Sequence, residues 1–359
     1  MKKKNPFEID FEEYIRHTDA SKKEKSFAWS TAIGLQQVDG LKTSPYLYET
    51  AKKNIEGELS FDEAKKLIDS YYESKNVRSD EDERTEEADK VSSRIAQILS
   101  EPSFNFSPSH LVAIHKRLFD GIFKFAGKIR DYDITKKEWV LNGDTVMYGA
   151  AFELKVALDY DFDIERNFKY SGLSNDEIVK HISFFVSRLW QIHAFGEGNT
   201  RTTAVFTIKY LRSLGYKVDN DIFAENSWYF RNALVRANYK NLKDGIEENP
   251  VYLEHFFRNL ILGENNELKN RYTHIDYDKS EKKFGDNEES SEKKFGDNQK
   301  SSEIILELLK VNPRLSAKKL SEQIGITSRA VEKQLAVLVE KGLLIREGSP
   351  KGGHWVILS

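Results

Sequence analysis

A short polar break between two apolar helical runs, at residues 190–201, constrains this chain more than any other stretch. Before the break, apolar residues recur at helical spacing, and a second apolar run begins at Ala204. The break reads Trp190-Gln-Ile-His-Ala-Phe-Gly-Glu-Gly-Asn-Thr-Arg201. A glycine-rich break that opens a helix leaves backbone N–H groups free at the positive end of the helix dipole. The pattern therefore predicts an anion site between two helices.

Helical patterns also dominate the first part of the chain. Three short helices are expected before residue 78: the first ends at Gly40, the second begins at Pro45, and the third begins at Ser60 with Glu63 completing a capping box. A module of roughly 50 residues is close to the lower size limit for independent folding, so we expect it to pack against its neighbour. Ser107-Pro108 marks a further helix start, and the whole pattern predicts a mainly α fold.

One β feature is predicted before the C-terminal region. The Asn142-Gly143 pair lies between the β-prone runs Trp139-Val-Leu and Thr145-Val-Met-Tyr. Such a pair is the strongest short-range signal for a hairpin, so we expect two paired strands here.

The last hundred residues divide into a linker and a small domain. Residues 264–300 contain a direct repeat, Ser-Glu-Lys-Lys-Phe-Gly-Asp-Asn, beginning at Ser280 and again at Ser291. Its charge favours an unfolded spacer, with a short docking motif as the alternative. Residues 301–359 combine a helix-turn-helix pattern with a terminal hairpin, which indicates a winged helix. From residue 300 this region has ten basic and six acidic residues, a net charge of +4 that suits contact with DNA phosphates.

Composition narrows the function classes. The 359 residues include no cysteine, which excludes disulfides, thiol nucleophiles and zinc–thiolate sites. The basic start has no apolar segment of a signal peptide, and no apolar run is long enough to cross a bilayer. These features lead us to expect a cytoplasmic location and no membrane partner.

The residue types in the break suit phosphate chemistry. His193 titrates near neutrality and can take a proton from a hydroxyl group. Glu197 offers the oxygen ligand that Mg²⁺ prefers. Gly198 and Asn199 present backbone N–H groups to a phosphate, and Arg201 can bind phosphate oxygens with its forked guanidinium group.

The run His193-Ala-Phe-Gly-Glu-Gly-Asn-Thr-Arg201 closely resembles the Fic (Fido) signature, His-Pro-Phe-x-(Asp/Glu)-Gly-Asn-x-Arg-x-x-Arg. The resemblance covers roughly residues 80–262 and implies a Fic-type helical core with a β-hairpin flap. It also implies transfer of AMP from ATP to a Ser, Thr or Tyr hydroxyl of a target protein, with release of pyrophosphate. Under the resemblance, the site residues have these roles: His193 as general base, Glu197 as Mg²⁺ ligand and nucleotide contact, Gly198, Asn199, Thr200 and Arg201 as the phosphate site, and Trp139, Val140 and Leu141 as the flap that binds the target.

Two positions depart from the signature. Ala194 replaces the usual Pro, and Ala204 replaces the second Arg, which the family associates with the γ-phosphate and with inhibition. The N-terminal module resembles the antitoxin-type domain that accompanies Fic enzymes, with Leu35, Asp39 and Gly40 in place of its Ser/Thr, Glu and Gly/Asn. The resemblance implies an intramolecular regulator whose inhibitory pair is altered. A purely structural brace is the alternative.

The expected organisation is an antitoxin-like helical module over residues 1–78, a Fic core over 79–263, a linker over 264–300 and a winged helix over 301–359. A protein adenylyltransferase is the favoured function. The alternatives are a DNA-binding regulator whose Fic core senses nucleotide, and a Fic enzyme that transfers UMP or a phosphoryl group. The resemblance implies a target protein as partner, and also a second copy of the chain, since Fic proteins often self-associate. The winged helix implies DNA as a further partner.

Overall fold

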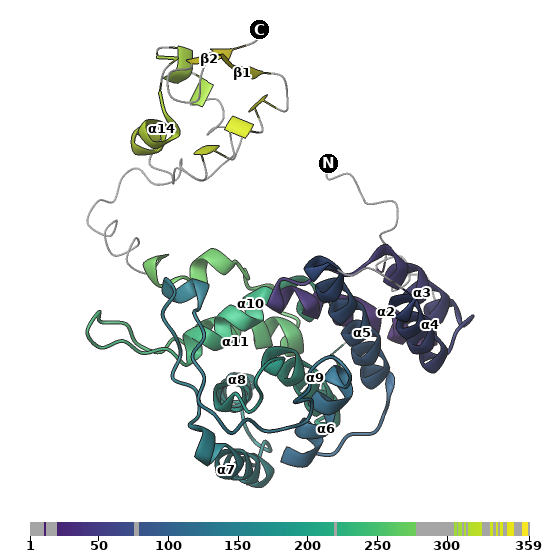
Figure 1. Cartoon of the computed structure of the whole chain (residues 1–359). Helices are drawn as coiled ribbons and strands as arrows, with labels where there is room; N and C mark the ends of the chain where they lie inside the picture. Colours follow the sequence, from purple (N-terminus) through teal and green to yellow (C-terminus); the bar gives the residue numbers. More distant parts are fainter. Residues whose placement is uncertain are drawn as a thin grey trace. The chain divides into compact units, whose positions relative to one another are not determined.

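The computed structural model describes Phe11, residues 20–74, 79–218 and 221–277, and separate stretches between 305 and 357 (Figure 1). The chain divides into two compact units, Met1–Lys282 and Lys283–Ser359. The described part of the first unit is mainly helical, as the sequence predicts, and within it strand pairing is limited to one isolated bridge between Asn241 and Ile246.

The elements of the first unit that hold the motif and its surroundings follow one another in this order: α2 (Ala20–Gly34), η1 (Leu35–Asp39), α3 (Pro45–Glu56), α4 (Phe61–Glu73), α5 (Asp80–Ser100), α6 (Pro108–Phe119), η2 (Trp139–Leu141), η3 (Ala151–Glu153), α7 (Leu154–Asn167), α8 (Asn175–Ile192), α9 (Asn199–Ser213), α10 (Ile222–Ala237), α11 (Val251–Phe257), η4 (Arg258–Leu262) and η5 (Asn270–Thr273).

Serine side chains define where many of these helices begin. The hydroxyl oxygen of the N-cap serine accepts a backbone N–H bond at the start of five helices, α3, α4, α5, α6 and α8. Three of these starts are among those predicted from sequence: Pro45 for α3, Ser60 with its Glu63 capping box for α4, and Ser107-Pro108 for α6. Gly40 ends η1 in the left-handed conformation, which confirms the predicted stop.

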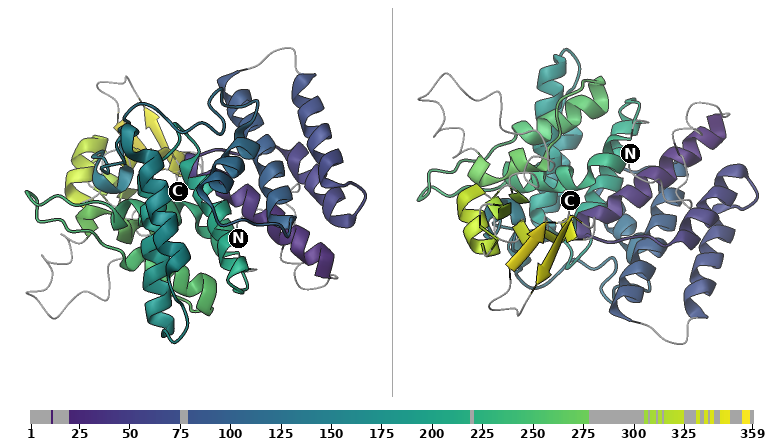
Figure 2. Two further views of the ribbon diagram at one scale, coloured as in Figure 1. Left: turned by 90° about the horizontal axis from the view of Figure 1, so that it is seen from below. Right: turned by 90° about the horizontal axis from the view of Figure 1, so that it is seen from above.

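The N-terminal helices share one hydrophobic core with the helices that follow. Helix α2 packs against both α5 and α10 (Figures 1 and 2). A Cβ atom on Gly34 would lie 2.3 Å from the carbonyl oxygen of Ala224, so glycine is required where α2 meets α10. The Ser227 hydroxyl donates to the Gly34 carbonyl at 2.7 Å across the same contact. The small module therefore packs against its neighbour, as its size predicts.

The region predicted as a β-hairpin turns back on itself without forming strands. The Glu138 N–H donates to the Asp144 carbonyl at 2.9 Å, so the chain does reverse direction around Asn142-Gly143. Residues 139–141 form the 3-10 turn η2, however, and residues 128–138 and 144–150 have no strand pairing. Val140 and Leu141 are buried in the core. Burial of both side chains favours a compact turn over two exposed strands. The local sequence pattern cannot reveal this burial.

The predicted linker begins later than expected. Residues 264–277 pack on the helical unit: the Arg236 guanidinium donates to the Thr273 carbonyl at 2.9 Å, and the ring of His274 lies edge-on to Trp139. Both copies of the repeat lie outside the described residues. Among the residues that the structure describes, no helix has the length and apolarity needed to cross a membrane.

The second unit has its own small core. Helix α14 (Ala317–Ile324) contributes Leu320, which packs with Ile305, Val331 and Leu335. Strands β1 (Leu344–Glu347) and β2 (His354–Ile357) pair antiparallel, in the terminal hairpin predicted from sequence. The tip of this hairpin lies outside the described residues, as does the segment between α14 and Val331.

Candidate active site

His193 lies at the end of α8, in the centre of the predicted motif. Its backbone is left-handed, with φ of 50°, a strained conformation that non-glycine residues adopt mainly at special sites. Its Nδ1 lies 3.3 Å from the Trp190 carbonyl oxygen. Because a carbonyl can only accept, Nδ1 carries the proton and Nε2 holds the free lone pair.

The free nitrogen of His193 is buried and has no hydrogen-bond partner among the described residues. Burial lowers the pKa of His193 well below its ordinary value, with Lys136 adding to the effect through its charge. The imidazole is therefore neutral at physiological pH, as a general base must be. A buried, unpaired nitrogen in a strained residue is an arrangement expected at a reactive site.

The loop after His193 is held in shape by Asn199. The Asn199 side chain accepts the Phe195 N–H at 2.9 Å and donates to the Phe195 carbonyl at 2.7 Å. Gly198 sits between them with φ of 75°, and a Cβ there would lie 2.4 Å from the ring of Phe119. The Thr200 hydroxyl accepts from the indole of Trp190 at 3.0 Å. These contacts fix the backbone of residues 195–200.

Helix α9 begins at this loop without a side-chain cap. Gly198 is its N-cap residue and has no side chain to accept the first N–H groups. In each of the five serine-capped helices, by contrast, the serine hydroxyl accepts one of these N–H groups. The N-terminus of α9 therefore offers backbone donors and a positive dipole end to an anion, beside the free nitrogen of His193.

Arg201, predicted to bind phosphate, already has three polar partners. Its Nε lies 2.8 Å from Asp39 Oδ2, and its Nη2 donates to Glu87 Oε1 at 2.6 Å. Its Nη1 donates to Gln36 Oε1 at 3.1 Å. The guanidinium carbon also lies 4.8 Å from the centre of the Phe119 ring, and the residue is 2% exposed. Arg201 is thus enclosed by side chains from η1 and α5.

Asp39 has a different partner from the one that its position implies. The inhibitory residue it resembles pairs with the second Arg of the signature, which is Ala204 here and is fully buried. In the structure Asp39 pairs with the first, Arg201. Gly40 lets the chain turn directly after this contact, and the Arg84 guanidinium donates to the Asp39 carbonyl at 3.2 Å.

Glu197, predicted to bind Mg²⁺, has an exposed carboxylate. Its Oε2 lies 2.8 Å from Nζ of Lys136, and its side chain is 53% exposed. No cluster of three or more metal-binding side chains occurs among the described residues. Mg²⁺ at nucleotide sites is commonly held by one or two carboxylates together with substrate phosphates. A single accessible carboxylate beside the end of α9 fits that mode of binding.

The sequence did not single out His115, yet this residue contacts the loop at Phe195 and Glu197. Its Nδ1 accepts the Gly127 N–H at 2.9 Å, so its Nε2 carries the proton and donates to the Glu197 carbonyl at 3.0 Å. The ring stacks on Phe195 at 3.7 Å. Burial lowers the pKa of His115 to about 4. The one available signal was a histidine on the apolar face of α6.

Arg130 is a second residue that the sequence did not reveal. Its buried guanidinium donates to the carbonyl oxygens of His193 at 2.8 Å and Tyr132 at 2.6 Å, and also to that of Gly149. Its backbone N–H donates to the Ala194 carbonyl at 2.9 Å. Arg130 therefore ties the loop after α8 to the segment that precedes α7. Nothing local in residues 127–130 indicates carbonyl binding.

Beside His193 lies a buried network centred on Glu138. The two terminal guanidinium nitrogens of Arg231, Nη1 and Nη2, contact this carboxylate at 2.8 and 3.0 Å, and the Tyr148 hydroxyl donates to it at 3.0 Å. The Tyr148 ring lies 4.2 Å from the His193 ring. Burial raises the pKa of Glu138, and burial together with Glu138 raises the pKa of Tyr148. The network therefore holds a neutral phenol against the imidazole of His193.

The predicted flap residues divide by exposure. Trp139 is half-exposed, whereas Val140 and Leu141 are buried. The three residues lie next to the Glu138 network that contacts His193, but the last two present no side chain to a partner.

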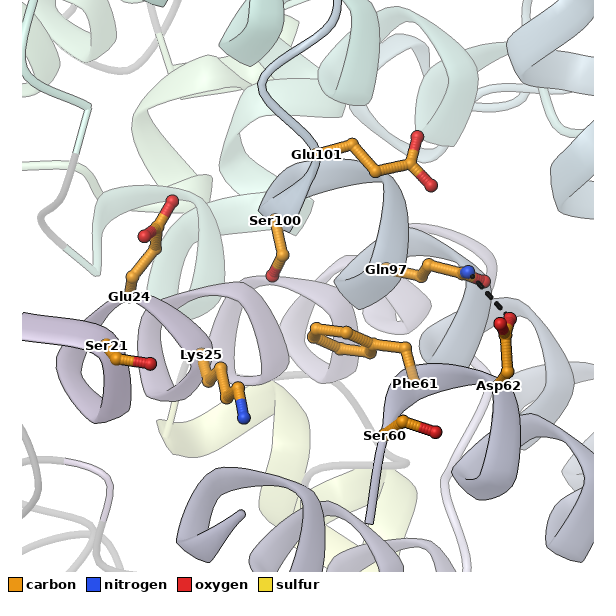
Figure 3. Close-up of a pocket in the computed structure, with 9 residues that line it drawn as sticks. All are labelled: Ser21, Glu24, Lys25, Ser60, Phe61, Asp62, Gln97, Ser100 and Glu101. Carbon is orange, nitrogen blue, oxygen red and sulfur yellow. Dashed lines mark hydrogen bonds between the residues drawn. The ribbon is translucent and has the colours of Figure 1, made fainter.

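A separate pocket of about 320 Å³ lies between α2, α4 and α5 (Figure 3). Phe61 and Lys25 line it together with the acidic residues Glu24, Asp62 and Glu101. The Gln97 amide donates to Asp62 at 3.1 Å. None of the residues of the predicted motif lines this pocket, so it is distinct from the site around His193.

Together, a helical core, a buried histidine and an uncapped helix end define a candidate phosphate-chemistry site. Residues 105–211 match the model of the Fic/DOC family, and residues 300–345 match that of a winged helix-turn-helix DNA-binding domain. The chain therefore contains a Fic domain and a C-terminal winged helix.

Curated relatives match over a third of the chain. The protein adenylyltransferase VbhT of Bartonella schoenbuchensis is 30% identical over 119 residues, which are 33% of this chain and 24% of VbhT. The probable protein adenylyltransferase Fic of Salmonella typhimurium is 26% identical over 119 residues, 33% of this chain and 56% of that protein. The chain thus spans about a quarter and just over half of these two relatives. It is related to protein adenylyltransferases at the level of the Fic domain.

Solved structures with Fic domains are also similar. A Fic family protein from Desulfovibrio desulfuricans G20 is 12% identical, with a TM-score of 0.43, over 97% of this chain and 94% of that chain. The N-terminal Fic domain of a putative cell filamentation protein from Bartonella quintana, with bound ADP, is 21% identical with a TM-score of 0.41. That match covers 52% of this chain and 87% of the other.

Proposed function

We propose that this protein transfers AMP from ATP to a hydroxyl side chain of a target protein or of itself. The observation that carries the proposal is the buried, unpaired Nε2 of His193 beside the uncapped N-terminus of α9. This pair places a neutral base next to donors for a phosphate group. The relationship to protein adenylyltransferases supports a nucleotide as the substrate.

In the proposed reaction, His193 Nε2 takes the proton of the target hydroxyl, whose oxygen attacks the α-phosphorus of ATP. The new bond joins oxygen to phosphorus, and the bond to the leaving pyrophosphate breaks. The N–H groups at the start of α9 hold the phosphate oxygens, and Arg201 adds its charge once it is released. Mg²⁺, bound by Glu197 and the phosphates, would neutralise charge that develops during the transfer.

We further propose that the N-terminal module regulates this activity. Asp39 and Gln36 from η1, with Glu87 from α5, occupy the guanidinium group that a phosphate would need. ATP must therefore compete with two carboxylates for Arg201. The structural alternative, in which η1 only braces the Fic core, predicts no change in activity when Asp39 is altered.

The test uses ATP labelled at the α-phosphate. Wild-type protein should incorporate label into itself or into proteins of a cell extract, and His193→Ala should abolish incorporation while still binding ATP. Loss of both labelling and ATP binding in His193→Ala would indicate a structural defect, which a melting curve would identify. Wild-type protein that binds ATP but incorporates no α-label would overturn the proposal.

A second function is proposed for residues 301–359. The match to a winged helix-turn-helix DNA-binding model and the net charge of +4 from residue 300 onward support binding to DNA. Binding to random-sequence and selected duplexes should survive His193→Ala and disappear when residues 301–359 are removed. Unchanged DNA binding by the truncated protein would contradict this assignment.

A further inference from the structure

The cations around His193 differ sharply in how firmly they are held. Arg201 is enclosed by two carboxylates and an amide, as described above. Arg130 donates to backbone carbonyls and is 5% exposed, and Arg231 is paired with the buried Glu138. Each of these three groups would lose several buried contacts if it moved toward a ligand, so none is readily available to an incoming phosphate.

Lys136 is held differently. Its ammonium group contacts the Glu197 carboxylate at 2.8 Å, and their side chains are 24% and 53% exposed. Ion pairs open to water contribute little to stability, because solvent screens the charges and the long side chains lose freedom. Breaking this contact therefore costs little. Lys136 is the cation near the described motif that can most easily exchange its partner.

The position of Lys136 also suits an anion. Glu197 immediately precedes Gly198, the N-cap residue of α9, where the free backbone donors begin. The charge of the same ammonium group also lowers the pKa of His193. Lys136 thus contacts the residue directly before the positive end of the helix. Exposure alternates along this segment: Lys136 and Glu138 are partly or fully buried, whereas Lys137 and Trp139 are exposed.

Ala204 adds a reason to look for another cation. It lies one turn into α9 from Arg201, is fully buried, and has no charge to offer. A triphosphate carries more negative charge than the N–H groups of one helix end can neutralise, so a further cation is needed. Among the described residues at this site, Lys136 is the one positioned to supply it without breaking a buried network.

We propose that Lys136 is a phosphate-binding residue that exchanges Glu197 for the outer phosphates of the nucleotide. This exchange also frees the Glu197 carboxylate for a divalent cation, so one movement prepares both groups. The inference rests on the proposed nucleotide-transfer function, because it assigns the residue to that site. It differs from a blocking role, in which Lys136 would only keep cations away from Glu197.

The test compares the binding of ATP, ADP and AMP to the full-length protein by calorimetry, with transfer measured separately. Lys136→Ala should weaken ATP binding about tenfold and leave AMP binding unchanged, because only the outer phosphates lose their partner. Lys136→Arg should restore most of the ATP affinity. Lys137→Ala removes an equal charge from the adjacent, exposed position and should change none of the three affinities.

Each other outcome bears on the inference. Unchanged or tighter ATP binding by Lys136→Ala would overturn it and favour a blocking role. Equal losses for ATP and AMP would overturn it as well, because they would indicate a general defect. Asp39 pairs with Arg201 and could prevent ATP from binding at all. The series is therefore repeated with Asp39→Asn in every variant, and a lack of ATP binding by the Asp39→Asn protein would also refute the inference. Binding that depends on Lys136 without any AMP transfer would refute the proposed function alone.

Discussion

Replacing Asp39 by Asn removes one of the two carboxylates that hold Arg201 and preserves the shape of the side chain. Arg201 is 2% exposed, and its contact with Asp39 is 2.8 Å long. A partly buried ion pair of this kind contributes about 1–2 kcal/mol, and Glu87 remains as the second partner. The cost of releasing Arg201 to a phosphate should fall by that amount. We therefore expect self-labelling from α-labelled ATP to rise about 5- to 30-fold.

The assay follows initial labelling rates at an ATP concentration below half-saturation, where affinity and rate both contribute. Glu58→Gln is the matched control, since it removes an exposed carboxylate of the same module. The double variant Asp39→Asn/Glu87→Gln should fold less stably, by about 3–5 kcal/mol, because it leaves the Arg201 cation buried without a counter-charge. A labelling rate for Asp39→Asn equal to that of the wild type, with unchanged ATP affinity, would refute the reasoning and leave η1 as a brace.

Three further predictions concern the supports of the site. Burial lowers the pKa of His115 from 6.5 to about 4, so this histidine is protonated at a higher pH in the unfolded chain than in the folded protein. The free energy of unfolding should therefore drop by up to about 3 kcal/mol between pH 6.5 and 4. A His115→Gln variant should show a smaller drop in denaturant titrations. In Arg130→Lys a single ammonium group cannot reach all the carbonyl oxygens that the guanidinium group binds. We therefore expect at least a tenfold loss of labelling and a stability loss of about 2–3 kcal/mol. Wild-type values in both assays would contradict the role given to Arg130. Gly198→Ala adds a Cβ 2.4 Å from the Phe119 ring, whereas a Cβ at Gly172, which has a similar φ, meets nothing within 4 Å. Calorimetric melting should therefore show a loss of stability that is larger by about 1–3 kcal/mol for Gly198→Ala than for Gly172→Ala. Equal losses of stability would be inconsistent with the clash.

Features encoded in neighbouring residues were predictable. The Ser60–Glu63 capping box, the Ser107-Pro108 helix start and the stop at Gly40 each depend on contacts within a few residues. The same is true of the break between α8 and α9, where glycine, asparagine and a polar run interrupt two apolar helices. Such signals locate the ends of elements because the groups that satisfy the backbone lie in the same stretch of sequence.

Contacts between distant parts of the chain were not predictable. Glu87 lies 114 residues from Arg201, and neither local sequence shows that one side chain will bind the other. Carbonyl binding by Arg130 depends on how α8 ends, which its own surroundings do not encode. The turn at residues 139–141 departs from the strand pattern because Val140 and Leu141 are buried by tertiary packing, which overrides the local preference for a hairpin.

The central claim is that His193 directs AMP onto a hydroxyl group. The most direct test incubates the Asp39→Asn protein with ATP and Mg²⁺ and measures its intact mass, followed by peptide mapping of the modified residue. We predict a mass increase of one adenylyl group on a Ser, Thr or Tyr side chain, absent from the Asp39→Asn/His193→Ala protein. An increase of one phosphate, or an adenylyl group that persists without His193, would contradict it.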